Sequence, residues 1–236
     1  MLFNGIDLNP YLKIKSIQGR GMTNATVEMT DLTGTDGSHF RRRTRGPRSI
    51  TIDADIRGTD REDIRRKIED VNGILDVNNP VPIEFPDEKG KIYYGVPEAS
   101  SEDDEYFFKH QGQLTIICPK PDKIGAQIKK TLGNSTSSIY YEGTAKTRPI
   151  INVTFSESAS FYEVENQDGL KVKINYDFQP SDELELNFQT QKITINGELQ
   201  MTSLAWSVSD WFFIEPGYNT LQSSQQAKMR YVKKWK

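Results

Sequence analysis

The stretch RSITIDADI, from Arg48 to Ile56, decides the fold of the first half of the chain. Its apolar and polar residues alternate, and a period of two is typical of a strand with one buried face and one solvated face. Gly58 ends this run. The following segment, Asp60 to Val77, carries apolar residues at helical spacing, and Thr59 with Glu62 fits a capping box at its start. The sequence therefore predicts a strand followed by a short helix that packs on the sheet.

Further strands are expected after this helix. Pro82–Pro86 is a short apolar run between prolines, Lys91–Gly95 follows a turn, and Leu114–Ile117 precedes a stop at Cys118–Pro121. We expect residues 1–122 to form an α+β domain, an antiparallel β-sandwich or sheet with one packed helix. The chain as a whole is predicted to be mainly β.

The composition changes after Pro121. Residues 123–138 contain Gly125 and the polar run Gly133–Ser138, which predict a linker, with one short helical face formed by Ile124, Ile128 and Leu132. Residues 139–236 then show an all-strand pattern with turns between the runs, which favours a β-sandwich domain. The predicted strands are Ile150–Phe155, Ser160–Glu165, Leu170–Phe178, Leu184–Gln189, Lys192–Ile195, Trp211–Ile214 and Met229–Trp235.

Four arginines cluster near the start of the chain, after strands expected at Tyr11–Ile17 and Ala25–Met29. They are Arg41, Arg42, Arg43 and Arg45. One interpretation is a solvated hairpin tip. A second is a contact arm that reaches acidic residues of a neighbouring subunit, because arginine is favoured at interfaces. The acidic candidates are Glu102, Asp103, Asp104 and Glu105. Nucleic-acid binding is the weakest interpretation, because no aromatic residues are interleaved with the arginines.

Composition excludes several classes of protein. The 236 residues are 35% hydrophobic and 27% charged with a net charge of -3, which indicates a soluble chain and argues against a dedicated nucleic-acid binder. No apolar run approaches the roughly 20 residues of a membrane-spanning helix. Met1–Asp7 lacks the features of a signal peptide. A single cysteine, Cys118, cannot form an internal disulfide and suits assembly in a reducing cytoplasm.

The residues give no sign of catalytic chemistry. The chain has two histidines, His39 and His110, and neither has an evident nucleophile beside it in the sequence. The acidic run from Ser101 to Glu105 could ligate calcium, but it lacks the alternating spacing that lets a loop surround the ion. We therefore expect no catalytic residue, no metal site and no cofactor, and we expect that the protein is not an enzyme.

An ordered series of short motifs resembles the distal tail protein family of siphophages and related prophages of Gram-positive bacteria. The motifs extend over nearly the whole chain in the family's order. They are Pro47–Ile52 with Gly58, Phe85–Asp87 with Tyr93–Gly95, Gly112–Pro121, Gly143–Ala145 with Arg148–Ile151, Asp182–Leu186 with Ile195–Gly197, and Phe213–Asn219. At Asn187-Phe188 the sequence departs from the family, which has an aspartate nearby.

This resemblance implies a structural role at the tip of a phage tail. Family members form a homohexameric ring, and the N-terminal domains with an extended hairpin build that ring. The C-terminal domains are β-sandwiches similar to galectins or carbohydrate-binding modules. The implied partners are the tail tube protein, the tape measure protein, and a tail-associated lysin, tail fibre or receptor-binding protein. DNA would pass through the ring without being specifically bound, and the protein would assemble in the host cytoplasm and reside at the virion tail tip, with no membrane partner.

The alternative is a carbohydrate-binding β-sandwich that attaches to the host surface. Trp206, Trp211 and Trp235 could stack on sugar rings. Trp211 and Trp235 also fit strand patterns, in which they would face the core. The mass of the protein in solution distinguishes a closed oligomer from a monomeric lectin.

Overall fold

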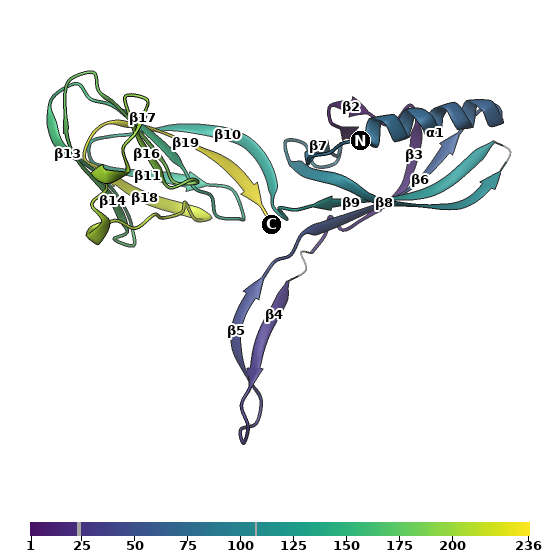
Figure 1. The fold of residues 1–236 in the computed structure, drawn as a ribbon, viewed down its shortest axis with the longest axis horizontal. Helices are drawn as coiled ribbons and strands as arrows, with labels where there is room; N and C mark the ends of the chain where they lie inside the picture. Colours follow the sequence, from purple (N-terminus) through teal and green to yellow (C-terminus); the bar gives the residue numbers. More distant parts are fainter. Residues whose placement is uncertain (23–24, 107) are drawn as a thin grey trace. The chain divides into compact units, whose positions relative to one another are not determined.

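The computed structural model describes residues 1–22, 25–106 and 108–236, and within these the side chains of 99–100 and 102–106 are outside the description. The chain forms two compact units, residues 1–123 together with Lys236, and residues 124–235. Strands dominate both units, so the prediction of a mainly β protein is confirmed (Figure 1).

The first unit contains a continuous antiparallel sheet. Its strands follow the order β3-β6-β9-β8-β7-β1-β2. Their bounds are β1 Leu2–Phe3, β2 Ile6–Asp7, β3 Leu12–Gln18, β6 Arg48–Arg57, β7 Val81–Glu84, β8 Ile92–Tyr106 and β9 Lys109–Cys118. The predicted alternation in β6 is confirmed, because Ile50 and Ile52 are buried while Ser49, which precedes Ile50, is exposed.

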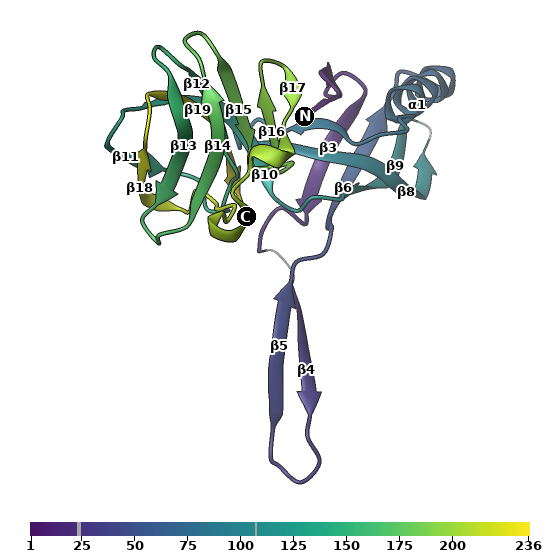
Figure 2. The ribbon, with the colours of Figure 1, turned by 60° about the vertical axis from the view of Figure 1, so that its left-hand side comes forward.

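The helix α1, Arg61–Leu75, packs on this sheet (Figure 2). Its cap lies one residue later than the predicted Thr59–Glu62 box. The Asp60 carboxylate accepts a hydrogen bond from the Asp63 amide at 2.8 Å, and the Asp63 carboxylate accepts one from the Thr59 amide at 3.1 Å. Ile64 and Val71 are buried.

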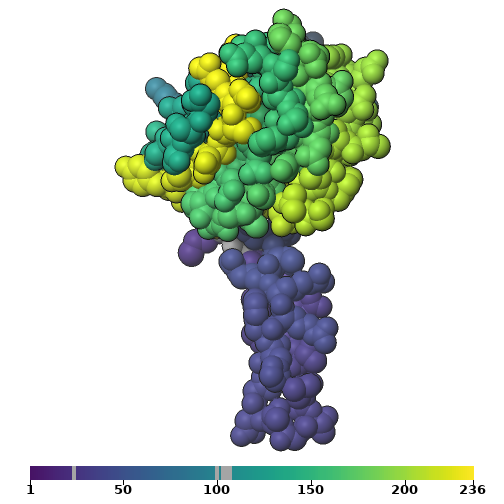
Figure 3. All heavy atoms as spheres, turned by 90° about the vertical axis from the view of Figure 1, so that its left-hand side faces the viewer, coloured from purple at the N-terminus to yellow at the C-terminus, as the bar shows by residue number. Residues whose placement is uncertain are grey.

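Two strands of the first unit form a separate sheet. β4, Thr26–Asp31, and β5, Ser38–Thr44, pair with each other as a two-stranded hairpin. The hairpin is the violet ribbon in Figure 2 and the violet column of atoms in Figure 3. We call it the arm.

The second unit is a β-sandwich. One sheet has the order β17-β16-β15-β12-β19-β10 and the other β11-β18-β13-β14. The bounds are β10 Lys123–Leu132, β11 Thr136–Tyr141, β12 Ile150–Thr154, β13 Ala159–Asn166, β14 Lys171–Phe178, β15 Glu183–Asn187, β16 Lys192–Ile195, β17 Glu198–Leu199, β18 Gly217–Ser223 and β19 Ala227–Trp235. Two short 3-10 turns, Met201–Ser203 and Trp206–Val208, follow β17. Buried side chains of both sheets form one core, in which Phe178 stacks on Phe155 with ring centroids 3.9 Å apart.

The sequence and the structure differ in three segments of this unit. Residues 123–138, predicted as a linker with a short helical face, contain the strand β10 and the start of β11. Trp211–Ile214, predicted as a strand, contributes only an isolated bridge from Ile214 to Thr147. β18 was not predicted, because its alternating polar residues hide a buried set of Asn219, Leu221 and Ser223.

Candidate assembly site

The arm has an apolar face that no described residue buries. In an antiparallel pair, directly opposed residues share a face and successive residues alternate. Val27 lies opposite Arg43, and Met29 lies opposite Phe40. Val27, Met29 and Phe40 are 45%, 59% and 63% exposed. Three large apolar side chains therefore stand on one face of the hairpin, and no layer of described residues packs on that face.

A β-bulge creates this face. Glu28 pairs with Arg42, yet the next residue, Met29, pairs with Phe40, so Arg41 is the extra residue. A regular ladder would have put Arg41 opposite Met29. The opposite face is polar and carries the Glu28–Arg42 ion pair and the Thr30–His39 pair.

The four predicted arginines lie at the arm but have different surroundings. Arg42 pairs with Glu28 inside the hairpin, and Arg45 bonds Asp122 in the same unit. In the described part of the chain, Arg41 and Arg43 form no ion pair and are exposed. Two of the four cations are thus already neutralised, and the other two are available to a partner.

The four acidic residues predicted as partners lie in the strand β8. Glu102 lies opposite Gly112, and Glu105 lies opposite His110. The side chains of Glu102, Asp103, Asp104 and Glu105 lie outside the described residues. Their contact with the arginines of another subunit stays a prediction.

A buried arginine fixes the base of the arm. Arg48 is 4% exposed, and its guanidinium donates hydrogen bonds to the carbonyls of Gly19 at 2.9 Å and Pro121 at 3.0 Å. It also lies over the ring of Tyr93, 5.9 Å from the centroid. One side chain therefore connects the segment that enters the arm, the strand that leaves it and the end of the first unit.

A second charged group lies beside this one. Arg20 forms two hydrogen bonds with the Asp87 carboxylate, at 2.8 and 2.6 Å, and lies 4.3 Å from the ring centroid of Phe85. Glu88 accepts hydrogen bonds from Lys123, at 2.6 Å, and from the Tyr93 hydroxyl. These contacts attach the turn after β7 to both the entry of the arm and the start of β10.

The charged groups shift the acidity of these side chains. The hydrogen bond from Arg20 lowers the pKa of Asp87 below its ordinary range. Burial alone would raise the pKa of Glu88, but hydrogen bonds from Lys123 and Tyr93 outweigh it and leave that pKa lowered. The neighbouring cations therefore stabilise both carboxylates in their charged form.

The predicted sugar-binding tryptophans of the second unit do not share one environment. Trp206 is 66% exposed. Trp211 is half-buried and meets the Phe188 ring edge-on at 4.9 Å, and Trp235, in β19, is also half-buried. An exposed aromatic pair lies instead on β11 and β18, where the ring centroids of Tyr140 and Tyr218 are 5.0 Å apart.

The described residues carry no arrangement that would support catalysis. Among them, no three histidine, cysteine or acidic side chains gather closely enough to hold a metal ion. Cys118 is buried, and burial raises the pKa of its thiol to about 11, so the nucleophilic thiolate is disfavoured. Within the same residues, no helix has the length and apolar character that crossing a membrane requires.

Sequence reasoning missed the residues that shape the base of the arm. Arg48 and Arg20 are single cations in strand and turn patterns. The hydrogen-bond partners of Arg48 are 27 to 73 residues away in the sequence, and that of Arg20 is 67 residues away. A signal was present for the apolar face, since Val27 and Met29 alternate with polar residues. Phe40 cannot be assigned to this face from the sequence, because the bulge changes which residue of β4 it lies opposite.

Comparisons with known proteins agree with this architecture. Residues 5–118 match the family model of the phage tail protein RIFT-related domain, and residues 142–235 match that of the siphovirus-type tail component, C-terminal domain. The distal tail protein of Bacillus phage SPP1 is 31% identical over 241 residues, which cover 100% of this chain and 95% of the relative.

Solved structures give the same result. The crystal structure of SPP1 Dit, described as a hub of the adsorption apparatus in phages that infect Gram-positive bacteria, superposes with a TM-score of 0.88 at 26% identity, covering 99% of this chain and 97% of that one. A chain of the phage p2 baseplate with strontium has the same fold, with a TM-score of 0.51 at 9% identity, and covers 97% and 91% of the two chains. The chain therefore belongs to the distal tail protein family of siphovirus-type tail components, and it is a structural protein of the virion tail tip rather than an enzyme.

Proposed function

We propose that the protein forms a homohexameric ring at the distal end of the tail tube, and that the arm joins neighbouring subunits. The uncovered apolar face of the arm carries this proposal. A two-stranded hairpin in water is marginally stable by itself, and it needs a further layer on an apolar face. Val27, Met29 and Phe40 are exposed within their own unit, so a second copy is the natural cover.

The geometry of a ring suits such an arm. In a closed head-to-tail assembly, one surface of each subunit contacts a different surface of the next, and each contact is repeated around the circle. The apolar face would supply most of the binding free energy, since exposed ion pairs contribute only about 0–1 kcal/mol each. Arg41 and Arg43 would add orientation through acidic residues of the neighbour, with Glu102, Asp103, Asp104 and Glu105 as the candidates.

The ring would have partners on both sides and at its periphery. We infer contacts with the tail tube protein and the tape measure protein, and with a tail-associated lysin, tail fibre or receptor-binding protein. DNA would pass through the opening without specific contacts. The relative in phage SPP1 is described as a hub, which supports this role.

The test is the mass of the full chain in solution and of two matched double variants. Met29→Ser with Phe40→Ser removes the apolar pair, whereas Thr30→Ser with His39→Ser changes the neighbouring pair on the polar face. Sedimentation should give a hexamer for the native chain and the polar-face control, and a folded monomer for the apolar-face variant. A native chain that is monomeric at all concentrations, or an apolar-face variant that assembles normally, would contradict the proposal.

The arginines require a separate comparison. Arg41→Ser with Arg43→Ser should weaken the ring at low salt, because these two cations have no partner in the described part of the chain. Arg42→Ser removes a cation that is already paired with Glu28 and should change assembly less. If the native chain binds duplex DNA at physiological salt and the Arg41/Arg43 variant does not, the arm is a nucleic-acid contact instead.

A second candidate function, saccharide binding by the sandwich, has one observation in its favour. Tyr140 and Tyr218 are 57% and 79% exposed and lie beside each other on one sheet face, as sugar-stacking rings do. Trp206 is the tryptophan of the three that is exposed enough to take part. Titration of cell-wall saccharides against the native chain and Tyr218→Ala tests this function, and equal signals from both proteins would exclude this pair.

A further inference from the structure

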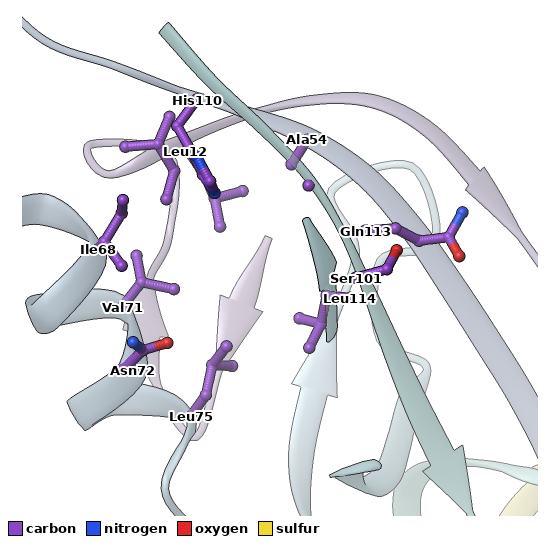
Figure 4. Close-up of a pocket in the computed structure, with 12 residues that line it drawn as sticks. Leu12, Ala54, Ile68, Val71, Asn72, Leu75, Ser101, His110, Gln113 and Leu114 are labelled. Carbon is purple, nitrogen blue, oxygen red and sulfur yellow. The ribbon is translucent and has the colours of Figure 1, made fainter. Parts of the chain in front are cut away.

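A cavity lies between α1 and the sheet of the first unit, and no function described above uses it. Its volume is about 170 Å³. Its walls are mostly aliphatic and come from α1 and from the strands β3, β6, β8 and β9. Figure 4 shows the lining side chains. They include Leu12, Ala54, Ile68, Val71, Leu75 and Leu114.

One wall carries a polar atom without a partner. His110, in β9, is 7% exposed and lines the cavity, and its Nδ1 makes no hydrogen bond to any described residue. In Figure 4 its ring points into the space between Leu12 and Val71. Buried polar groups are nearly always hydrogen-bonded, so an unpartnered nitrogen at a cavity wall marks a position for a ligand's polar group.

The other polar residues of the cavity do not compete for that role. The Gln113 amide donates to the Asp53 carboxylate at 2.7 Å, and Figure 4 shows its side chain turned away from the helix. Asn72 on α1 and Ser101 on β8 are exposed. His110 is therefore the one deeply buried hydrogen-bonding group among the lining residues.

The size and chemistry of the cavity select a class of ligand. An enclosed apolar cavity of about 150 Å³ accommodates benzene, so this cavity, which is partly open to solvent, has room for one six-membered ring. A rigid ring fills such a space without losing internal rotations on binding. A hydroxyl group can donate to or accept from an imidazole nitrogen, so it suits either tautomer of His110.

We propose that this cavity binds a phenol group, with the ring among the aliphatic side chains and the hydroxyl hydrogen-bonded to His110 Nδ1. The phenol can belong to a free small molecule or to a tyrosine side chain of another chain. This proposal does not depend on the hexameric assembly, because the cavity lies within the first unit alone.

The chain provides a convenient reporter. It has two histidines, and the second, His39, is exposed on the arm. Nuclear magnetic resonance of the imidazole carbons therefore contains a signal at the cavity and an internal reference. Titration of the full chain with phenol should shift the His110 signal in a saturable way and leave His39 unchanged. Benzene should bind about tenfold more weakly, as expected from the loss of one hydrogen bond.

The variant His110→Phe keeps a ring of similar shape and removes the nitrogen. We expect it to bind phenol and benzene with equal affinity by calorimetry, while His39→Phe binds both as the native chain does. The absence of saturable binding, or equal affinities for phenol and benzene in the native chain, would overturn the proposal even if His110→Phe does not fold.

The same titration on assembled particles separates the two sources of the phenol. If a tyrosine of a neighbouring chain occupies the cavity, assembly should shift the His110 signal by itself and abolish phenol binding. If the ligand is a free molecule, phenol should bind assembled and unassembled chains alike.

Discussion

The arm and the C-terminal sandwich are built from the same material, antiparallel hairpins, but they differ in where their apolar side chains go. In the sandwich, each sheet buries one face against the other, and Phe178 has no exposed surface. In the arm, Phe40 stands on a face that is bare in the described chain. The sandwich completes its own core, whereas no described residue covers the apolar face of the arm, and our proposal assigns that role to a second copy.

The largest expected effect is the difference in unfolding free energy between a phenylalanine-to-alanine substitution in the sandwich and one in the arm. Phe178→Ala removes a buried ring that stacks on Phe155, and it should cost about 3–5 kcal/mol of unfolding free energy. Phe40→Ala removes an exposed ring and should change the unfolding free energy of the monomer by no more than about 0.5 kcal/mol. Chemical denaturation of dilute protein measures both, and similar losses would mean that the arm is covered within its own chain.

The base of the arm should be nearly as sensitive as a core. Gly19 has a φ of +85°, and a methyl group there would lie 1.9 Å from the Ser49 carbonyl oxygen. Gly19→Ala should therefore destabilise the first unit by about 1–3 kcal/mol or more.

Gly21 is the matched control for this glycine, because a methyl group there meets no atom within 4 Å. Gly21→Ala should be nearly neutral when the same denaturation curves are recorded. Equal effects at the two positions would show that the close approach of Gly19 to β6 does not constrain the arm.

A smaller effect is expected from acid. The pKa values of Asp87 and Glu88 are lowered in the folded unit from ordinary values of 3.8 and 4.5. Their contribution to stability is thus complete above the ordinary values and is lost as the pH falls through the lowered ones. Hydrogen-exchange protection of β7 and β8, measured relative to the intrinsic rate of an unfolded chain at the same pH, should therefore fall from about pH 5 downwards.

Asp87→Asn with Glu88→Gln removes both of these titrating groups. In this variant the loss of protection on acidification should be smaller than in the native chain, although protection at neutral pH should already be lower. An identical pH profile in the two proteins would show that other groups control the acid sensitivity of this region.

The smallest effect should come from the ion pair on the arm. Arg42 and Glu28 are 70% and 48% exposed, so water and salt screen their attraction. Arg42→Gln should change the unfolding free energy by at most about 0.5 kcal/mol. A loss greater than about 1 kcal/mol, measured at physiological salt, would mean that charge rather than backbone pairing holds the hairpin together.

Local patterns in the sequence predicted the elements whose surroundings are simple. β6 and α1 have one buried face each, and their periods of two and of about 3.6 are visible in the residues. β10 was misassigned for a physical reason. Ile124, Ile128 and Leu132 are four residues apart, and this even spacing puts them on one face of a helix and equally on one face of a strand.

The sites depend on contacts that no local pattern contains. The arginine cluster is visible in the sequence itself. Which of its members are paired is not, because this depends on Glu28, which binds Arg42, and on Asp122, which binds Arg45. The cavity beside His110 forms only when β3, β6, β8, β9 and α1 come together. In the sequence, His110 is an isolated histidine between Lys109 and Gln111.

The bulge at Arg41 has a consequence for how the length of this segment can vary. Removing Arg41 would leave Phe40 beside Met29 in a regular ladder, because these two residues are already paired. A register without the bulge but with Arg41 retained would instead put an arginine beside Met29 and turn Phe40 to the opposite face. A deletion at this position is therefore a milder change than a slip of one residue, although the slip leaves every amino acid in place.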